Sequence, residues 1–342
     1  MKAVRLEAAG QINLCDVDKP RPGPGDLLVR VEACGICGTD RHLFNGEFPS
    51  EPPLTLGHEF TGIVEEIGRD ITGFREGIRI TGDPNIACGH CDQCRRGRVN
   101  LCRNLQAIGI SRDGGFAQYV IVPQNQAFVL PDDLNPLYGA FCEPLACCLH
   151  GVDLAEIRTG SSVAILGGGV IGLLVVQLAR LAGATDILLI TRSAEKRRLA
   201  ESLGATATVD PNDGGIIERI TAPDGLLPGG ADVVIECAGV AGTVEQAPAL
   251  ARHGGTVVIL GVMPQGEKVS IEPFDLLFRE IRLVSSFLNP FTHKRAADLV
   301  ASGRIKVEPL ISRRIGLNEA MEAIRNPARA GEIRTLVLPN LG

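Results

Sequence analysis

The sequence has no excess of basic charge and no long uninterrupted apolar run. It contains 34 Lys and Arg against 40 Asp and Glu, a net charge of −6, and therefore offers no basic surface for a nucleic-acid backbone. Glycines interrupt the apolar stretch from Val163 to Leu178, and the first residues, MKAVRLEAAGQINL, are charged where a signal peptide is apolar. We expect no nucleic-acid partner, no membrane association and no secretion. The expected partners are small molecules, and the expected location is the cytoplasm.

A disulfide framework is not indicated either, because the 11 cysteines are odd in number and several stand at metal-ligand spacing. Such thiols fit a reducing compartment. Four of them form a C-x2-C-x2-C-x7-C pattern: Cys88, Cys91, Cys94 and Cys102. This spacing lets a short loop present four thiolates to a tetrahedral ion. It predicts a closed, structural zinc site.

The length of 342 residues exceeds that of one ordinary core and favours two domains. Up to about Leu145, short β-like runs at 26–33, 62–67 and 116–122 alternate with Gly/Pro-rich turns, which indicates a β-rich domain. From Ala146, buried strands alternate with helices, which is typical of a parallel, doubly wound dinucleotide-binding sheet of about six strands. The expected strands are 162–166, 186–191, 233–236, 256–260 and 281–285, and the expected helices are 169–182 and 194–203.

After residue 287 the alternation stops. Helical patterns at 292–302 and 317–323 and a last strand at 334–338 are expected to pack back on the first domain. The predicted division is thus 1–145 with 288–342 for the first domain and 146–287 for the second.

A glycine fingerprint follows the strand at 162–166. Gly167, Gly169 and Gly172, with Val170 and Ile171 before the last of them, satisfy G-x-G-x-x-G at the start of a helix. The first glycine permits the tight turn, the second lets backbone N–H groups approach a pyrophosphate, and the third allows close packing of helix on strand. The pattern predicts a dinucleotide site.

The end of the next strand favours NADP(H) over NAD(H). A site for NAD usually has Asp or Glu there against the ribose 2′-hydroxyl, whereas this chain has Thr191, Arg192 and Ser193. A carboxylate would repel a 2′-phosphate, and Arg192, with help from Arg197, would attract it. The alternative is that Arg192 stacks on adenine or points to solvent, so that both cofactors bind.

A second potential metal set lies outside the cysteine pattern. Cys37, the adjacent His58 and Glu59, and the later Glu143 are a mixed set of the kind that leaves a coordination position open for chemistry. The pair Cys34 and Cys37 alone also fits a redox or structural motif, but the neighbouring histidine and carboxylates favour a metal. One closed and one open site indicate a zinc enzyme.

These motifs resemble those of the zinc-containing medium-chain dehydrogenase family. Gly57-His58-Glu59 opens the family's G-H-E-x-x-G-x5-G signature, and the four-cysteine segment, Glu143-Pro-Leu145 and the glycine fingerprint follow in the family's order and spacing. The resemblance covers essentially the whole chain. It implies an α/β protein that combines a Rossmann doubly wound parallel sheet with a β-rich, GroES-like catalytic domain.

The resemblance also implies roles for individual residues. Cys37 and His58 look like ligands of a catalytic zinc, Glu59 like a third ligand or an exchangeable neighbour, and Glu143 like a ligand bound directly or through water. Thr39 and His42 match the family's proton-relay positions. Asp40 resembles the carboxylate that orients the histidine ligand. The plain alternatives are a turn-capping threonine and a surface histidine.

The implied activity is hydride transfer between the secondary alcohol of a polyol and NADP. Glu143 followed by Pro-Leu is similar to polyol and threonine dehydrogenases, whereas other alcohol dehydrogenases of the family carry cysteine there. Leu288 and Asn289 stand where sorbitol dehydrogenases have an Arg-Tyr pair, which argues against sorbitol itself. The alternatives are an L-threonine or simple secondary-alcohol dehydrogenase, and a non-catalytic NADP(H)-binding sensor. Bacterial members of the family are usually homodimers or homotetramers, and the same is expected here.

Overall fold

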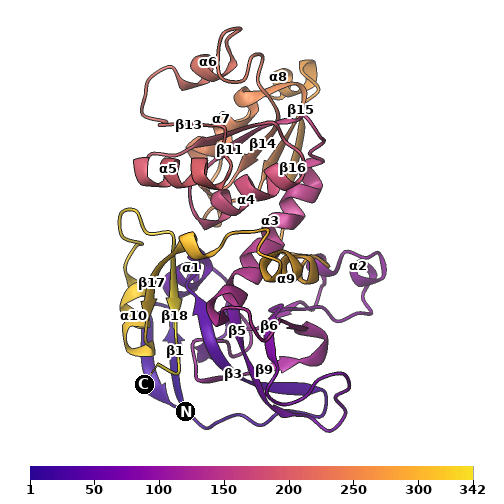
Figure 1. The fold of residues 1–342 in the computed structure, drawn as a ribbon, viewed down its shortest axis with the longest axis vertical. Helices are drawn as coiled ribbons and strands as arrows, with labels where there is room; N and C mark the ends of the chain where they lie inside the picture. Colours follow the sequence, from indigo (N-terminus) through magenta and orange to yellow (C-terminus); the bar gives the residue numbers. More distant parts are fainter. Residues whose placement is uncertain (342) are drawn as a thin grey trace. The chain divides into compact units, whose positions relative to one another are not determined.

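A computed structural model describes residues 1–341 and shows two compact units. The first consists of Met1–Ala146 together with the chain from Pro290 on, and the second of Cys147–Asn289 (Figure 1). We propose that these units correspond to the two domains expected from the sequence. No helix of the described residues is both long enough and apolar enough to cross a membrane.

The second unit is built on a six-stranded sheet in which every pairing is parallel. Its strand order is β13-β12-β11-β14-β15-β16, which is that of a doubly wound dinucleotide-binding sheet with a switch point between β11 and β14. The predicted sheet is thereby confirmed. The strands are β11 (Ser162–Leu166), β12 (Asp186–Ile190), β13 (Ala207–Val209), β14 (Ala231–Glu236), β15 (Ala251–Ile259) and β16 (Arg282–Ser285).

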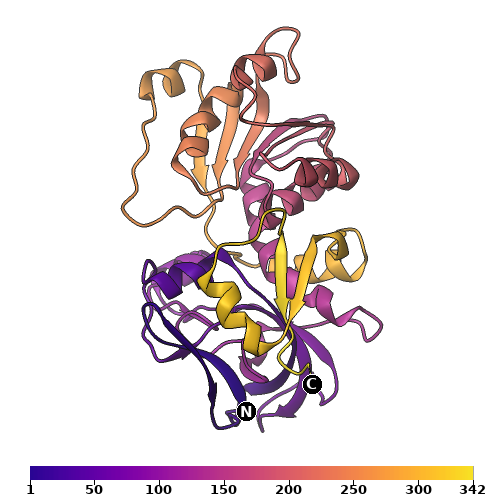
Figure 2. The ribbon, with the colours of Figure 1, turned by 90° about the vertical axis from the view of Figure 1, so that its left-hand side faces the viewer.

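Helices cover both faces of this sheet, as Figure 2 shows. The strands are almost continuously apolar because both faces are buried; β11, for example, reads SVAIL. The Ser193 side chain caps the second of the predicted helices by accepting a hydrogen bond from Lys196 N at 3.4 Å. The helices are α4 (Val170–Leu181), α5 (Ala194–Leu203), α6 (Ile216–Thr221), α7 (Ala241–Leu250) and α8 (Pro273–Phe278), preceded by α3 (Cys142–Ala155).

The first unit is rich in strands, as expected. A sheet of order β2-β1-β4 accompanies a seven-stranded sheet whose path is β10-β6-β5-β3-β18-β17, with β9 paired to β3, and β7 pairs with β8. These strands are β1 (Lys2–Ala8), β2 (Gln11–Asp16), β3 (Asp26–Gly35), β4 (Leu54–Thr55), β5 (Glu59–Ile67), β6 (Arg79–Gly82), β7 (Asn85–Ile86), β8 (Gln106–Ala107), β9 (Tyr119–Pro123), β10 (Ala127–Val129), β17 (Ile311–Ile315) and β18 (Arg334–Val337). The helices are α1 (Gly38–Asn45), α2 (Asp92–Arg95), α9 (His293–Ala301) and α10 (Leu317–Arg325), and short 3-10 helices span Val99–Leu101, Gln124–Gln126, Pro136–Phe141 and Glu308–Leu310.

The end of the chain completes the first unit. β18 runs antiparallel to the end of β3, where Val337 pairs with Cys34 and Leu336 with Gly35, and both termini lie in this unit (Figures 1 and 2). One expected strand is shorter than predicted: β9 begins at Tyr119 rather than at Phe116. Phe116 instead donates its backbone N–H to the Leu56 carbonyl, just before the Gly57-His58-Glu59 segment.

Candidate functional site

The mixed metal set gathers where β3 ends and β5 begins. Gly35, the last residue of β3, pairs with Glu59, the first residue of β5, and Cys37 lies just before α1. The ligand atoms of Cys37, His58 and Glu59 all lie within 4.8 Å of one another. His58 is 4% exposed and Glu59 1%. Three of the four predicted ligand candidates therefore lie close together, and two of these three, His58 and Glu59, are almost fully buried.

Two glycines make this approach possible. A side chain at Gly35 would come within 2.2 Å of Glu59 Oε2, so only glycine leaves room for the carboxylate. Gly57 has a φ of +97°, and a Cβ there would lie 2.7 Å from Phe116 N. The turn that presents His58 and Glu59 therefore requires glycine for both its conformation and its packing.

Two charged side chains, Asp40 and Arg334, contact the cluster of Cys37, His58 and Glu59. Buried Asp40 accepts a hydrogen bond from Cys37 N at 2.8 Å, and its other oxygen lies 3.5 Å from His58 Nδ1. Arg334 reaches in from β18: Nη2 lies 3.1 Å from Glu59 Oε1, and Nη1 donates to the Ile36 carbonyl. Sequence reasoning missed Arg334. The available signal was a single arginine at the head of an otherwise uncharged terminal strand, RTLV.

The electrostatics of the trio favour a bound cation. Burial by itself would lower the pKa of His58, but the Asp40 carboxylate and the Cys37 thiol outweigh it and raise that pKa well above its usual value. Burial raises the pKa of Glu59, although Arg334 opposes this. Among the described residues, His58 Nδ1, Glu59 Oε2 and Asp40 Oδ1 have no hydrogen-bond partner. A thiol, an imidazole and a carboxylate with unsatisfied buried atoms fit a zinc ion.

Glu143 lies in the first turn of α3 and is 7% exposed. Its charge contributes to raising the pKa of Arg334, so it belongs to the same electrostatic environment. Within the described chain, it is not among the residues whose ligand atoms gather within 4.8 Å. Its role as a zinc ligand, direct or through water, stays a prediction.

The two residues expected to relay a proton lie on α1. Thr39 Oγ1 is 3.8 Å from Cys37 Sγ, and His42 follows Thr39 by three residues, which places both on one face of the helix. His42 Nδ1 lies 2.6 Å from Glu47 Oε2. Sequence reasoning did not identify Glu47.

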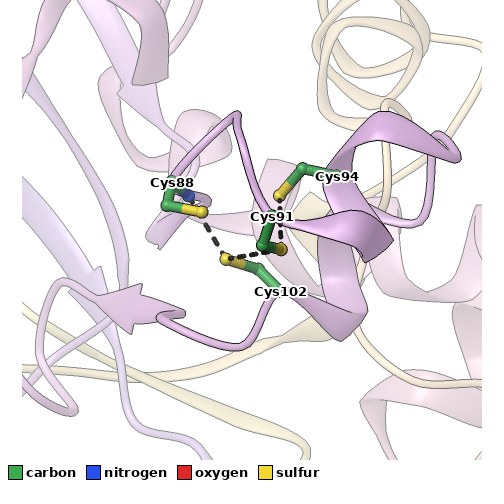
Figure 3. Close-up of side chains that lie close together, drawn as sticks. All are labelled: Cys88, Cys91, Cys94 and Cys102. Atoms are coloured by element: carbon green, nitrogen blue, oxygen red, sulfur yellow. Dashed lines mark hydrogen bonds between the residues drawn. The ribbon is translucent and has the colours of Figure 1, made fainter.

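The four remaining ligand candidates, Cys88, Cys91, Cys94 and Cys102, point toward one another in Figure 3. Their sulfur atoms lie within 4.8 Å, with Cys91 Sγ 3.5 Å from that of Cys94 and 4.0 Å from that of Cys102. Backbone N–H groups of Cys94 and Arg103 lower the pKa of Cys91 to about 6, whereas burial and the contact with Cys91 raise the pKa of Cys94 to about 12. Cys91 is thus the thiol of this pair that is favoured as the thiolate, the form that binds metals. The segment thus has the geometry of the predicted closed site, and we call residues 88–103 the cysteine lobe.

The glycine fingerprint occupies the turn between β11 and α4. Gly167 has a φ of +108°, and a Cβ there would lie 2.8 Å from Ala238 N, while a Cβ on Gly172 would strike the Gly167 carbonyl. Gly169 is the N-cap of α4, just before Val170 and Ile171, and a Cβ added there would have no other atom, apart from its chain neighbours, within 4 Å. The turn is therefore tight on one side and open at the helix N-terminus, where a pyrophosphate binds in such folds.

The residues that follow β12 differ in exposure and in their contacts. Arg192 is exposed, Ser193 caps α5, and Thr191 packs against Gly168. Arg197 Nη1 donates to the carbonyls of Thr191 and Arg192 and lies 2.9 Å from Asp210 Oδ2. Arg197 thus braces the turn, and its expected contact with a 2′-phosphate stays a prediction.

Comparison with known proteins identifies the family. An alcohol dehydrogenase GroES-like domain matches residues 23–132, and a zinc-binding dehydrogenase domain matches residues 170–302. L-threonine 3-dehydrogenase of Shewanella putrefaciens (strain CN-32 / ATCC BAA-453) is 32% identical over 322 residues, which are 91% of this chain and 92% of the relative. The chain belongs to the zinc-containing medium-chain dehydrogenase family.

Two solved structures of dehydrogenases match the fold of this chain over nearly its whole length. A zinc-binding dehydrogenase from Sinorhizobium meliloti 1021, crystallised with NADP, is 69% identical, has a TM-score of 0.98 and matches over 99% of each chain. Galactitol-1-phosphate dehydrogenase from Escherichia coli is 28% identical with a TM-score of 0.91, covering 99% of this chain and 100% of its own. The predictions of the family, of the α/β fold with a GroES-like domain and of a zinc-dependent dehydrogenase are confirmed.

Removal of one thiol from the cysteine lobe of this dehydrogenase is expected to loosen the lobe. Structural zinc contributes about 10 kcal/mol to local order, and the lobe carries exposed arginines at positions 95, 96, 98 and 103. Cys91→Ser should therefore be cut by trypsin in the lobe at least about 10-fold faster than the unchanged protein. Cys15→Ser, outside the lobe, is the control. Equal cleavage rates for both variants would contradict a structural zinc.

Loss of Arg334 is expected to destabilise the first unit. In the zinc-free protein, in which unfolding is measured, Arg334→Ala would leave Glu59 as a buried, unpaired carboxylate, and breaking a buried pair costs about 3–5 kcal/mol. Arg314→Ala is the matched control, because Arg314 in β17 forms an exposed pair with Glu308 at 2.7 Å and such pairs contribute about 0–1 kcal/mol. Denaturant unfolding of both variants measures the difference. A similar decrease in the free energy of unfolding in both variants would show that the buried pair stabilises the protein no more than the exposed pair.

Proposed function

We propose that this dehydrogenase oxidises a secondary alcohol group of a polyol with NADP+, or reduces the corresponding ketone with NADPH. The observation that carries the proposal is the cluster of Cys37 with the buried His58 and Glu59. The unpartnered atoms of His58 and Glu59 and the local negative charge fit a zinc ion. Glu143, followed by Pro-Leu as in polyol and threonine dehydrogenases, supports a substrate of these two classes rather than a simple alcohol.

The preference for NADP rests on charge. Arg192 is exposed directly after β12, and the acidic residue that would accept the ribose 2′-hydroxyl of NAD is missing there. The 69% identical dehydrogenase was crystallised with NADP, which supports the same cofactor for this chain.

Cys37, His58 and Glu59 would hold the catalytic zinc, and Arg334 and Asp40 would fix the carboxylate and the imidazole for that purpose. When bound, zinc acts as a Lewis acid that lowers the pKa of an alcohol hydroxyl. Thr39 Oγ1 would accept the hydroxyl proton while it gives up its own toward His42, one helical turn further, and His42 would take up that proton and release it to water. The carbinol carbon gives its hydride to the nicotinamide of NADP+, so that one alcohol yields one ketone, one NADPH and one proton.

L-Threonine is the second candidate substrate. Curated relatives that act on it, such as the Shewanella putrefaciens enzyme, are 32% identical over nearly the whole chain. Simple secondary alcohols and diols are included with L-threonine in the substrate panel described next.

A substrate panel tests the proposal. Zinc-loaded protein is incubated with polyols, diols, L-threonine and simple alcohols, each with NADP+ and NAD+, and the absorbance of the reduced nicotinamide is followed. Polyol turnover with NADP+ that disappears in Cys37→Ser supports both the substrate and cofactor assignment and the role of Cys37 in the zinc site. Turnover of threonine or simple alcohols alone would replace the substrate. Cofactor and zinc binding without any turnover would favour a sensor.

For assembly we propose a homodimer that forms through the second unit. β16 is an edge strand with Leu283 39% exposed, and α8 exposes Phe274, Leu277 and Phe278. Edge strands and apolar patches of this kind favour pairing with another chain. Leu283→Arg should sediment as a monomer, whereas Leu181→Arg, also at an exposed apolar position, should remain a dimer. A monomeric unchanged protein would overturn the proposal.

A cytoplasmic location is proposed on the state of the thiols. All 11 cysteines are free in the described chain, and proteins that keep thiols for metals are typical of reducing compartments.

A further inference from the structure

Two hydrogen bonds join Glu47 and His42 at the end of α1. His42 Nδ1 lies 2.6 Å from Glu47 Oε2, and the backbone N–H of Glu47 donates to the His42 carbonyl at 2.9 Å. Glu47 therefore contacts both the imidazole Nδ1 and the backbone carbonyl of His42. This is a more restrained arrangement than a single contact between two surface side chains.

The local backbone fixes the position of the Glu47 carboxylate. α1 ends at Asn45, and the φ of +74° at the following Gly46 turns the chain so that Glu47 folds back over the last turn of the helix. Asn45 Nδ2 donates to the other carboxylate oxygen at 3.2 Å. The hydrogen bond from His42 lowers the pKa of Glu47, so the carboxylate is ionised near neutral pH and can only accept. The shared hydrogen therefore belongs to Nδ1 of the imidazole.

We propose that Glu47 is a positioning residue that holds the neutral His42 in the Nδ1–H tautomer, so that Nε2 is the atom that takes up the proton. The proposal rests on the proposed function in one respect, since it assigns His42 to proton release. In a neutral imidazole only one ring nitrogen is an acceptor, and the partner of the other nitrogen decides which one. Without Glu47, the proton would be distributed over both nitrogens, and part of the molecules would present Nε2–H, which cannot accept.

A tautomer measurement tests this directly. The ring nitrogens are observed by 15N NMR, and the His42 signals are assigned by their disappearance in His42→Gln. The unchanged protein should show protonated Nδ1 and unprotonated Nε2, and Glu47→Ala should shift the population toward Nε2–H. Glu51→Ala is the matched control, because Glu51 is an exposed carboxylate on the following loop. An Nε2–H tautomer in the unchanged protein, or no change in Glu47→Ala, would overturn the proposal.

Kinetics supply the second arm. Glu47→Ala should lower kcat by about 10-fold, since a positioned acid–base group contributes about 100-fold or more and water replaces part of it. The KM for NADP+ should stay within about 2-fold. Glu47→Gln, whose amide oxygen still accepts from Nδ1–H, should recover most of the lost kcat. A changed tautomer with unchanged kcat would overturn the positioning role. If no substrate is turned over at all, the proposed function fails, and the NMR result still decides the tautomer.

Discussion

Replacement of Cys37 by alanine is expected to lower kcat/KM by at least about 1000-fold while leaving NADPH binding intact. The thiol is one of three ligand candidates that lie within 4.8 Å of one another. Its removal leaves an imidazole and a carboxylate, and two ligands hold zinc far more weakly than three. The glycine fingerprint lies in the other unit, Cys147–Asn289, and should still bind the dinucleotide. Zinc content, steady-state rates and fluorescence titration with NADPH measure these effects separately.

Cys34→Ala is the matched control for this experiment. Cys34 lies three residues upstream and is fully buried, but it belongs to the apolar core and not to the metal set. This variant should keep its zinc and most of its activity, at a moderate loss of stability from the smaller side chain. If Cys37→Ala keeps both its zinc and its rate, Cys37 is not a ligand. If it also loses NADPH binding, the change has disturbed more than the metal set.

Features that depend on neighbouring residues could be predicted from the sequence. The strand Ser162–Leu166 and the helix Ala194–Leu203 lie where apolar periodicity placed them. The cysteine lobe follows from spacing alone, because its ligands are close along the chain. In each case the physical cause is local.

Contacts made across the fold could not be predicted in the same way. Arg334 pairs with Glu59 only because β18 lies beside β3, and the strand itself gave no indication of the register. The same holds for Arg197, which resembled a phosphate ligand in the sequence. Its partner Asp210 comes after β13, and only the order of the strands brings the two together. Glu47 is close to His42 in sequence, but its contact depends on the left-handed turn at Gly46.

Arg192→Ala is expected to lower kcat/KM with NADP+ by about 30-fold while changing kcat/KM with NAD+ by less than about 3-fold. At ~4 Å and an effective dielectric of ~20, a guanidinium and a phosphate attract by about 4 kcal/mol. Solvent screening reduces this to about 2 kcal/mol, within the range of about 1.5–3 kcal/mol for a hydrogen bond to a charged group. NAD has no 2′-phosphate, so the loss should be confined to NADP+. Steady-state rates with both cofactors on one substrate measure the ratio.

Comparison of three arginines separates a direct contact with phosphate from a structural effect. Arg198 is exposed on α5, and Arg198→Ala is expected to leave the cofactor ratio unchanged. Arg197 holds the Thr191 and Arg192 carbonyls and Asp210, so Arg197→Ala should weaken both cofactors together through a looser turn. Only Arg192→Ala should act on NADP+ alone. An equal loss with both cofactors in Arg192→Ala would assign Arg192 to the adenine or the turn, and a loss in Arg198→Ala that matched it would mean that the effect is one of net charge.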